Sequence, residues 1–270
     1  MKCILEWHNM LLAIEAGNTN VVFALYDGKA ILHSWRCKTD SARTADEYAS
    51  WLYPLFLQAG LSFEAVNDAI VSSVVADANF NIRRLCEKHF SCTPLIVGQD
   101  AIELDVKAKI KKPEEMGADR LLHAMAVKHY YKYPAIVVDF GTSTTYDVID
   151  ENGDHCGGTI SPGVNVSMAA FRQAAAALPK VSIKKTDTVI GKDTVHAMQS
   201  GIYWGVISSV EGMITRISKE MGAKPFVIAT GGISSLFADG TPMIDQHDED
   251  LTMKGLIATY NHIRKKSKAA

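Results

Sequence analysis

Apolar residues along the chain form short strand-like runs that occur in two similar series. The first series predicts strands at 10–15, 21–26 and 30–36, and the second at 135–139, 144–149 and 155–160. Each opening strand ends on an acid, Glu15 or Asp139, which glycine and hydroxyl-bearing residues follow. The glycine of the next turn lies 13 residues after the acid in the first series and 14 in the second (28 − 15 and 153 − 139). The repeat predicts two related halves, each opening with a β-meander.

Strands and helices alternate in the rest of the chain, which is the pattern of an α/β protein. Further strands are predicted at 69–75, 93–97 and 226–230, and helices at 44–60, 77–89, after Gly163 and at 194–217. Thr44 and Glu47 form a capping box for the first helix, and Pro54 is expected to kink or shorten it. Three glycines interrupt the helix at 194–217, and they indicate either close helix packing or the approach of a ligand: Gly201, Gly205 and Gly212.

The turns that follow Glu15 and Asp139 are candidate phosphate-binding loops. Glycine lets backbone N–H groups approach phosphate oxygens, hydroxyl groups donate hydrogen bonds, and the acid can bind the accompanying cation. A hydroxyl-rich hairpin turn is the alternative for the segment 139–145 taken alone. Because the same turn occurs twice, we expect two loops that bind a nucleotide from two sides.

Composition and charge exclude several classes of protein. With 270 residues, 47% of them hydrophobic, and a net charge of −2, the chain is typical of a soluble globular protein without a basic surface for nucleic acid. The five cysteines show no C-x-x-C spacing, which favours reduced thiols in a cytoplasmic protein. No apolar run approaches the roughly 18–20 residues of a membrane span. Residues 1–9 lack the apolar core of a signal peptide, and the basic segment 264–268 is expected to be a solvated tail.

Phosphoryl transfer is the chemistry that these residues favour. The chain has neither the G-x-x-x-x-G-K-[ST] sequence of a P-loop nor a G-x-S-x-G nucleophile elbow. Asp119, at the head of an apolar helix, is the best candidate for a carboxylate beside the attacking hydroxyl, and Arg120 could hold an acidic substrate. The alternative is a helix-start residue that accepts from N-terminal amides, with Arg120 in a surface ion pair.

Six segments occur in the order seen in type III pantothenate kinases, a family that the chain resembles from Met10 to about Tyr260. They are 15–20, 117–120, 139–145, 157–163, 190–201 and 230–232. The resemblance implies two ribonuclease-H-like subdomains of the acetate-and-sugar-kinase/heat-shock/actin-like superfamily. It places the N-terminal half with the first phosphate loop at 10–116. The C-terminal half, with the catalytic Asp, the cation site and the dimer interface, is placed at 117–260.

The resemblance also implies an activity and its residues. The activity is transfer of the ATP γ-phosphate to the terminal hydroxyl of pantothenate, the first step toward coenzyme A. Asp119 would be the catalytic base, Asp139 would bind K⁺ or NH₄⁺, and Mg²⁺ would accompany ATP. A homodimer is implied, with Thr194 completing the pantothenate pocket across its interface. The implied ATP-binding residues are Glu15, Ala16, Gly17, Asn18, Thr19, Asn20, Val21, Val22 and Thr142, and the pantothenate-binding residues are Gly117, Ala118, Asp119, Arg120 and Thr194.

Two departures from the family pattern leave alternatives open. The family's first loop begins with Asp where this chain has Glu15, and a family segment with a tyrosine before Pro113 reads here with Ile110. These departures are expected to affect nucleotide and substrate affinity. One alternative is a non-catalytic regulator of the same fold, and retention of Asp119 argues against it. The other is a kinase that acts on another small hydroxy acid or a sugar.

Overall fold

The structure, a computed structural model, describes residues 10–99, 102–175 and 178–269. The N-terminal segment 1–9, on which the signal-peptide expectation depends, lies outside these residues. Contacts divide the chain into two compact units. Unit 1 contains the described residues up to Asp105, Glu115–Ala126 and those from Thr252 onward, and unit 2 contains Val106–Glu114 and Val127–Leu251. The boundaries 10–116 and 117–260 stay a prediction, because the units are defined by compactness alone.

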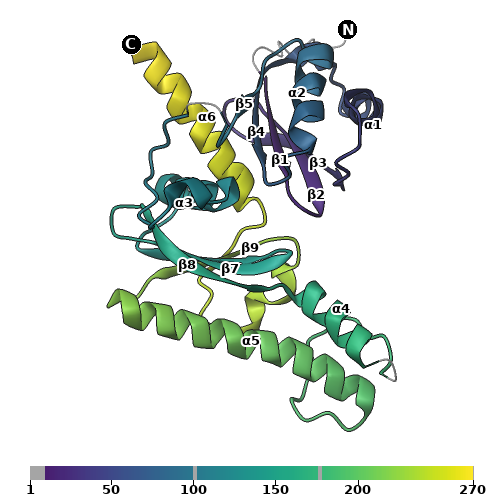
Figure 1. Cartoon of the computed structure of the whole chain (residues 1–270), viewed down its shortest axis with the longest axis vertical. Helices are drawn as coiled ribbons and strands as arrows, with labels where there is room; N and C mark the ends of the chain where they lie inside the picture. Colours follow the sequence, from purple (N-terminus) through teal and green to yellow (C-terminus); the bar gives the residue numbers. More distant parts are fainter. Residues whose placement is uncertain (1–9, 100–101, 176–177, 270) are drawn as a thin grey trace. The chain divides into compact units, whose positions relative to one another are not determined.

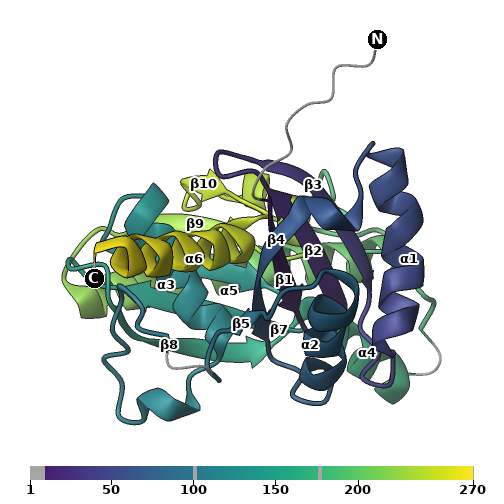
Figure 2. The same ribbon diagram turned by 90° about the horizontal axis from the view of Figure 1, so that it is seen from above.

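Unit 1 is built on a five-stranded sheet in the order β3-β2-β1-β4-β5. Its strands are β1 (Met10–Ala16), β2 (Asn20–Tyr26), β3 (Ile31–Lys38), β4 (Val66–Ser73) and β5 (Leu95–Ile96). The helices α1 (Ala45–Gln58) and α2 (Ala78–His89) pack beside this sheet, as Figures 1 and 2 show. Leu12, Ile14 and Phe23 of the sheet share one apolar cluster with Leu52 of α1 and Ile82 of α2. Both helices therefore cover the same face.

The opposite face of this sheet packs against two helices from later in the sequence. Leu11 and Ile70 form a buried cluster with Leu122 of α3 (Ala118–Tyr130) and with Leu256 and Ile257 of α6 (Leu251–Ala269). With both faces covered, β1 reads as a nearly continuous apolar run rather than an alternating one. Each buried aliphatic side chain of this kind contributes roughly 1.5–3 kcal/mol.

Unit 2 repeats this arrangement with a second five-stranded sheet, in the order β10-β9-β6-β7-β8. Its strands are β6 (Ala135–Phe140), β7 (Ser143–Ile149), β8 (His155–Pro162), β9 (Phe226–Thr230) and β10 (Gln246–His247). The long helix α5 (Thr194–Met221) runs along one face of this sheet beside α4 (Val164–Ala174), as Figure 1 shows. Tyr203, Ile207 and Val210 of α5 pack there against Tyr146 and Val148 of β7.

The predicted duplication is confirmed by the connectivity of the two sheets. In unit 1, β1 pairs antiparallel with β2 and parallel with β4. In unit 2, β6 pairs antiparallel with β7 and parallel with β9 in the same way. The third meander strand joins on the outer side of each pair. The two halves are therefore the same unit built twice, and the likeness extends to the ends of the strands that carry Glu15 and Asp139.

The structure corrects the expected shortening of a helix at Pro54 and confirms the exposure of the basic C-terminal segment. The helix α1 begins with the predicted capping box at Thr44 but continues through Pro54 to Gln58 instead of ending early. Proline removes the hydrogen bond to the Ser50 carbonyl, and both residues lie on the exposed side, where water can replace that bond. Residues 264–267 of the basic C-terminal segment are exposed, as expected for a solvated tail. They are also helical as part of α6, with Arg264 paired to Asp68 at 3.4 Å and Lys266 to Glu103 at 2.8 Å.

A glycine fixes the packing of α6 on α3. A β-carbon at Gly255 would overlap the carbonyl oxygen of Leu122, which is backbone and cannot swing aside. We expect Gly255→Ala to lower the free energy of unfolding by about 2 kcal/mol, because overpacking there outweighs the gain in helix propensity. The measurement is equilibrium urea unfolding. The control is Gly212→Ala in α5, where a β-carbon meets only the mobile end of Arg216, and which should be neutral or stabilising. Equal stability of both variants would contradict this packing.

Candidate active site

The first candidate loop connects β1 and β2 at the edge where β1 ends. Gly17 N–H donates to the Asn20 carbonyl at 2.9 Å and closes the turn, while Asn18 and Thr19 are exposed at its tip. Ala16 is anchored from β4, because Val74 N–H donates to its carbonyl at 3.0 Å. The residues on either side of the turn, Ala16 and Val21, are almost fully buried and hold its two ends in place.

Glu15 is the penultimate residue of β1. It lies opposite Val22 on β2 and Ser72 on β4, so its backbone is held from both sides. Its side chain is half-buried. This places a carboxylate oxygen donor directly below the first loop.

Asp139 occupies the matching position on β6, opposite Thr145 on β7 and Thr230 on β9. Its carboxylate lies against the backbone at Gly231, where a β-carbon would overlap Oδ1. Gly231 has a φ of 96°, a conformation that glycine adopts without strain. Gly231 thus leaves room for the Asp139 carboxylate. The carboxylate also lies beside Gly141 of the following turn.

The second loop, at Gly141–Ser143, is shaped by the end of β8. Gly141 N–H donates to the Ser143 carbonyl at 3.0 Å, and Gly163 N–H donates to the Thr142 carbonyl at 3.0 Å. A β-carbon at Gly163 would overlap the carbonyl oxygen of Thr142. The Thr142 side chain is exposed at the surface of this loop, where it can reach a ligand.

Gly117–Arg120 forms the start of α3 in unit 1. The Asp119 Oδ1 atom accepts from the Arg120 N–H at 2.9 Å, and a β-carbon at Gly117 would overlap this oxygen. The carboxylate therefore folds back over Gly117 and is held against the first turn of the helix. Asp119 and Arg120 are both half-buried. The helix-start geometry considered as an alternative is present, and it leaves the second carboxylate oxygen available for another role.

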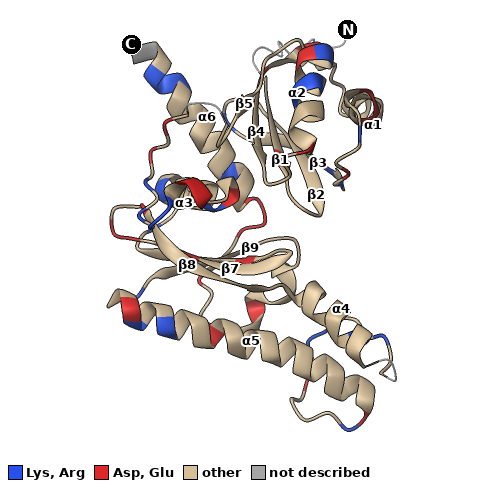
Figure 3. Cartoon of the chain, in the orientation of Figure 1, with Lys and Arg blue, Asp and Glu red and all other residues tan. Residues whose placement is uncertain are grey.

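Thr194 is the first residue of α5. Asp193 caps this helix by accepting from His196 N–H at 2.8 Å, and Thr194 is exposed. From Thr194 to Val210 the helix contains no charged residue, and this part is uniformly tan in Figure 3. Gly201 and Gly205, for which helix packing and the approach of a ligand were the two interpretations, have nothing within 4 Å of a would-be β-carbon. Within the described chain they do not serve packing.

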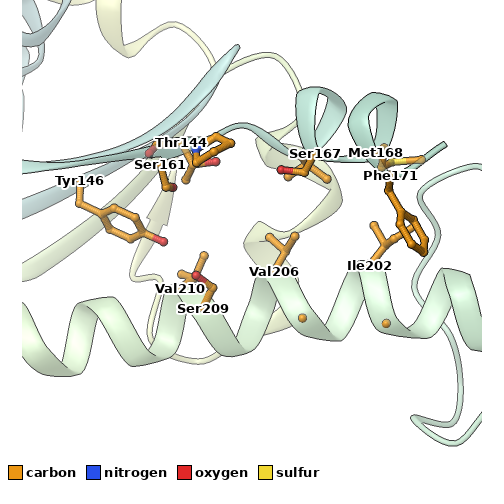
Figure 4. Close-up of a pocket in the computed structure, with 14 residues that line it drawn as sticks. Thr144, Tyr146, Ser161, Ser167, Met168, Phe171, Ile202, Val206, Ser209 and Val210 are labelled. Carbon is orange, nitrogen blue, oxygen red and sulfur yellow. Dashed lines mark hydrogen bonds between the residues drawn. The ribbon is translucent and has the colours of Figure 1, made fainter. Parts of the chain in front are cut away.

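These glycines line a cavity of about 380 Å³ between the sheet of unit 2, α4 and α5. Figure 4 shows Tyr146, Thr144 and Ser161 on its sheet side, Ser167 and Phe171 from α4, and Val206 and Ser209 from α5. Burial raises the pKa of Tyr146 to about 12, so its hydroxyl is neutral at physiological pH. None of the predicted site residues lines this cavity, and the cavity is mainly apolar.

Each unit offers a carboxylate of the chemical kind that binds the divalent cation of a nucleotide. Among the described residues, no three His, Cys, Asp and Glu side chains converge on one point. Mg²⁺ in phosphotransferases is usually held by one or two carboxylates together with phosphate oxygens and water. Glu15 and Asp139 are hard oxygen donors of this kind, each at the end of a central strand.

The structure groups the predicted residues by unit. Unit 1 carries Glu15–Val22 and Gly117–Arg120, and unit 2 carries Asp139, Thr142 and Thr194. Sequence reasoning missed Thr39, and it noted Gly163 only as the end of the glycine-rich segment 157–163, without its part in shaping the second loop. The signal that could have found them is the repeat itself, since each directly follows the third strand of a meander.

The duplicated sheets define the class of protein. Their architecture is the fold of two ribonuclease-H-like subdomains that acetate and sugar kinases, heat-shock proteins and actin share. The activator of the 2-hydroxyisocaproyl-CoA dehydratase from Clostridium difficile matches with a TM-score of 0.55 and 13% identity, over 97% of this chain and 98% of that one. MreB5 of Spiroplasma citri matches with a TM-score of 0.55 and 10% identity, over 98% and 100%. These likenesses concern the fold alone.

Sequence comparison narrows the class to one family. The family model for type III pantothenate kinase matches residues 11–216. The type III pantothenate kinase of Paramagnetospirillum magneticum is 50% identical over 248 residues, 92% of this chain and 95% of that protein. That of Caulobacter vibrioides is 47% identical over 253 residues, 93% and 97%. The chain belongs to the type III pantothenate kinase family, which confirms the resemblance seen in its motifs.

Proposed function

We propose that the chain catalyses ATP-dependent phosphorylation of pantothenate to 4'-phosphopantothenate, the first step of coenzyme A biosynthesis, in the cytoplasm. The observation that carries this proposal is about 50% identity to a type III pantothenate kinase along 92% of the chain. The local geometry agrees with it, because each unit ends its central strand in a carboxylate beside a glycine turn. Among the helices of the described residues, none is long and apolar enough to cross a membrane.

The two loops are assigned to the phosphates of ATP. Glu15–Val22 provides the first, with Asn18 and Thr19 exposed at its tip, and Thr142 contributes its hydroxyl from the second. Bound Mg²⁺ would neutralise phosphate charge, with Glu15 and Asp139 as the carboxylates available to hold it directly or through water. Asp139 is also the proposed ligand of K⁺ or NH₄⁺.

Asp119 and Arg120 are assigned to pantothenate. The terminal hydroxyl oxygen of pantothenate attacks the γ-phosphorus of ATP, the bond to the β–γ bridging oxygen breaks, and ADP leaves. Asp119 receives the proton of the attacking hydroxyl and holds that hydroxyl in line. Arg120 pairs with the substrate carboxylate through its planar guanidinium group. Gly117 supports this role because its lack of a side chain lets the Asp119 carboxylate fold back over it.

A homodimer is proposed through α4 and the N-terminal part of α5. Along α5, small residues recur at every fourth position on an exposed stripe: Ala197, Gly201, Gly205 and Ser209. Such a stripe lets a second helix approach closely, as in packing of i±4 ridges. Val166 and Phe171 of α4 beside it each expose 46% of their surface, and Val195 exposes 43%. An uncharged apolar face of this kind is suited to its own copy in a two-fold dimer, which would bring Thr194 to the partner's site.

The first prediction tests the function and the base together. The wild-type chain with ATP, Mg²⁺ and K⁺ should release ADP in a pantothenate-dependent reaction. A coupled assay measures the rate of ADP release. Asp119→Asn should lower kcat at least about 100-fold, since a general base contributes typically ~10²–10⁴-fold. Glu114→Gln, which removes an exposed carboxylate just before the motif, is the control and should keep full activity.

Two outcomes of this assay would count against the proposal. A fully active Asn variant would remove Asp119 from the role of base. A wild-type chain that turns over a different hydroxy acid or a sugar, but not pantothenate, would favour the alternative-substrate kinase. No turnover with any acceptor in a substrate panel, from folded protein, would favour the non-catalytic regulator.

A second prediction concerns the monovalent cation. Asp139→Asn retains the shape of the side chain against Gly231 but removes its charge, so activation by K⁺ over Na⁺ should be lost. The measurement is the ratio of rates in matched potassium and sodium buffers. Asp239→Asn, at an exposed carboxylate of the same unit, should keep the wild-type ratio. An unchanged potassium response in Asp139→Asn would place the ion elsewhere.

A third prediction tests the dimer. In solution the chain should have about twice its monomer mass of 29.5 kDa, as measured by light scattering after size exclusion. Gly205→Glu places a charge on the exposed stripe, so it should yield monomers and raise KM for pantothenate. Thr215→Glu, exposed near the C-terminal end of the same helix, should remain dimeric. A monomeric wild-type chain, or a dimeric Gly205→Glu variant, would refute this interface.

A further inference from the structure

One residue outside the first loop holds two of the loop's carbonyl groups. Thr39, directly after β3, donates its N–H to the Thr19 carbonyl at 2.9 Å. Its Oγ1 hydroxyl donates to the Gly17 carbonyl at 2.6 Å. Thr39 reaches the loop because β2 and β3 pair with Asn20 opposite Lys38, which brings the residue after Lys38 beside the turn. Its side chain is half-buried in this position.

These two bonds set the direction of the loop's N–H groups. In a trans peptide the carbonyl and the following N–H point in opposite directions. The only cis peptide among the described residues is at Tyr133–Pro134, so the loop peptides are trans. Drawing the Gly17 carbonyl toward Thr39 therefore turns the Asn18 N–H away from Thr39, and the Thr19 carbonyl fixes the Asn20 N–H in the same manner. The donors are held in one orientation before a ligand arrives.

Comparison with the second loop, in unit 2, shows that the hydroxyl bond of Thr39 is specific to the first loop. Gly163 occupies the matching place after β8, and its N–H donates to the Thr142 carbonyl at 3.0 Å, just as Thr39 N–H donates to Thr19. A β-carbon at Gly163 would overlap that carbonyl, so the second loop lies directly on the backbone and has no room for a side chain. The hydrogen bond that closes the first loop joins Gly17 to Asn20, whereas the bond that closes the second joins Gly141 to Ser143. The first loop is therefore one residue longer. There the Thr39 hydroxyl spans the remaining distance to Gly17.

We propose that Thr39 is a positioning residue for phosphate binding, which orients the Asn18 and Asn20 N–H groups of the first loop through its hydroxyl. The inference rests on the proposed role of Glu15–Val22 in binding ATP phosphates. Thr39 acts through the loop and does not contact the nucleotide. Any residue with an N–H could make the backbone bond, but only a β-hydroxyl supplies the second bond, so serine can replace threonine here and valine cannot.

The experiment compares Thr39→Val, which keeps the shape and the backbone N–H, with Thr39→Ser, which keeps the hydroxyl. The readouts are KM for ATP and the competitive inhibition constants of ADP and of adenosine. In Thr39→Val, KM for ATP and the ADP constant should rise about fivefold, the factor of one hydrogen bond. The adenosine constant, KM for pantothenate and the unfolding midpoint should stay at wild-type values, since adenosine has no phosphate. Thr39→Ser should remain within twofold of wild type throughout.

The opposite results would overturn the assignment. Unchanged ADP inhibition in Thr39→Val would show that the hydroxyl is dispensable. Equal weakening of ADP and adenosine, or a serine variant as weak as the valine variant, would reveal a general structural role. An active wild-type chain that binds ADP no more tightly than adenosine would instead refute the phosphate role of the loop, and Thr39 with it. A wild-type chain without kinase activity refutes the proposed function and is recognised before either variant is compared.

Discussion

Each half of this chain depends on one strand that is paired on both sides. β1 lies between the antiparallel β2 and the parallel β4, and β6 lies between β7 and β9 in the same way. A strand held by two ladders and buried on both faces cannot shift its register without exposing its apolar residues. Its end is therefore fixed in space. Since that end carries Glu15 in one half and Asp139 in the other, the two carboxylates are positioned by the sheets and not by the loops.

The loops beside these carboxylates are shaped largely by missing side chains. Gly231 leaves room for the Asp139 carboxylate, Gly163 for the Thr142 carbonyl, and Gly117 for Asp119. In each case an oxygen atom lies so close to the glycine that a β-carbon there would overlap it. Such contacts order polar groups at little cost in conformational entropy, because backbone or a short side chain is held and no long side chain is immobilised. The first loop is the exception, since a threonine hydroxyl does this work.

Much of the fold could be predicted because burial leaves a strong trace in sequence. Strand positions, the duplicated meander and the Thr44 capping box follow from local patterns, and the structure confirms them within a few residues. The helix α6 was not predicted. Its contact surface, Leu256 and Ile257, is defined only by the sheet face that it covers, and charged residues follow close behind in the sequence. The wrong expectation for Pro54 has a similar origin, because the solvent exposure that makes the lost hydrogen bond tolerable is a tertiary property.

The candidate site likewise contains features that local sequence patterns predict and features that depend on tertiary contacts. Its acidic and glycine-rich segments are contiguous, so their order in the chain was enough to indicate the family. Thr39 lies 22 residues from its Gly17 partner, and its position depends on the pairing of β2 with β3. No local pattern encodes such a bond. For Gly201 and Gly205 the sequence left helix packing and the approach of a ligand as alternatives, because a helix pattern cannot tell which of its faces the same molecule will cover. In the structure both glycines lie open on α5.

The return of α6 to the first unit has a consequence for how the chain matures. Unit 1 is interrupted in the sequence by most of unit 2, and the face of its sheet around Leu11 and Ile70 is covered by α3 and by a helix that begins at Leu251. On the ribosome, where synthesis proceeds from the N-terminus, this apolar face emerges first and is fully buried only after nearly the whole remaining chain has been made. The second unit, by contrast, has all its strands available before α6 is made. The half that is translated first is therefore the half that is completed last.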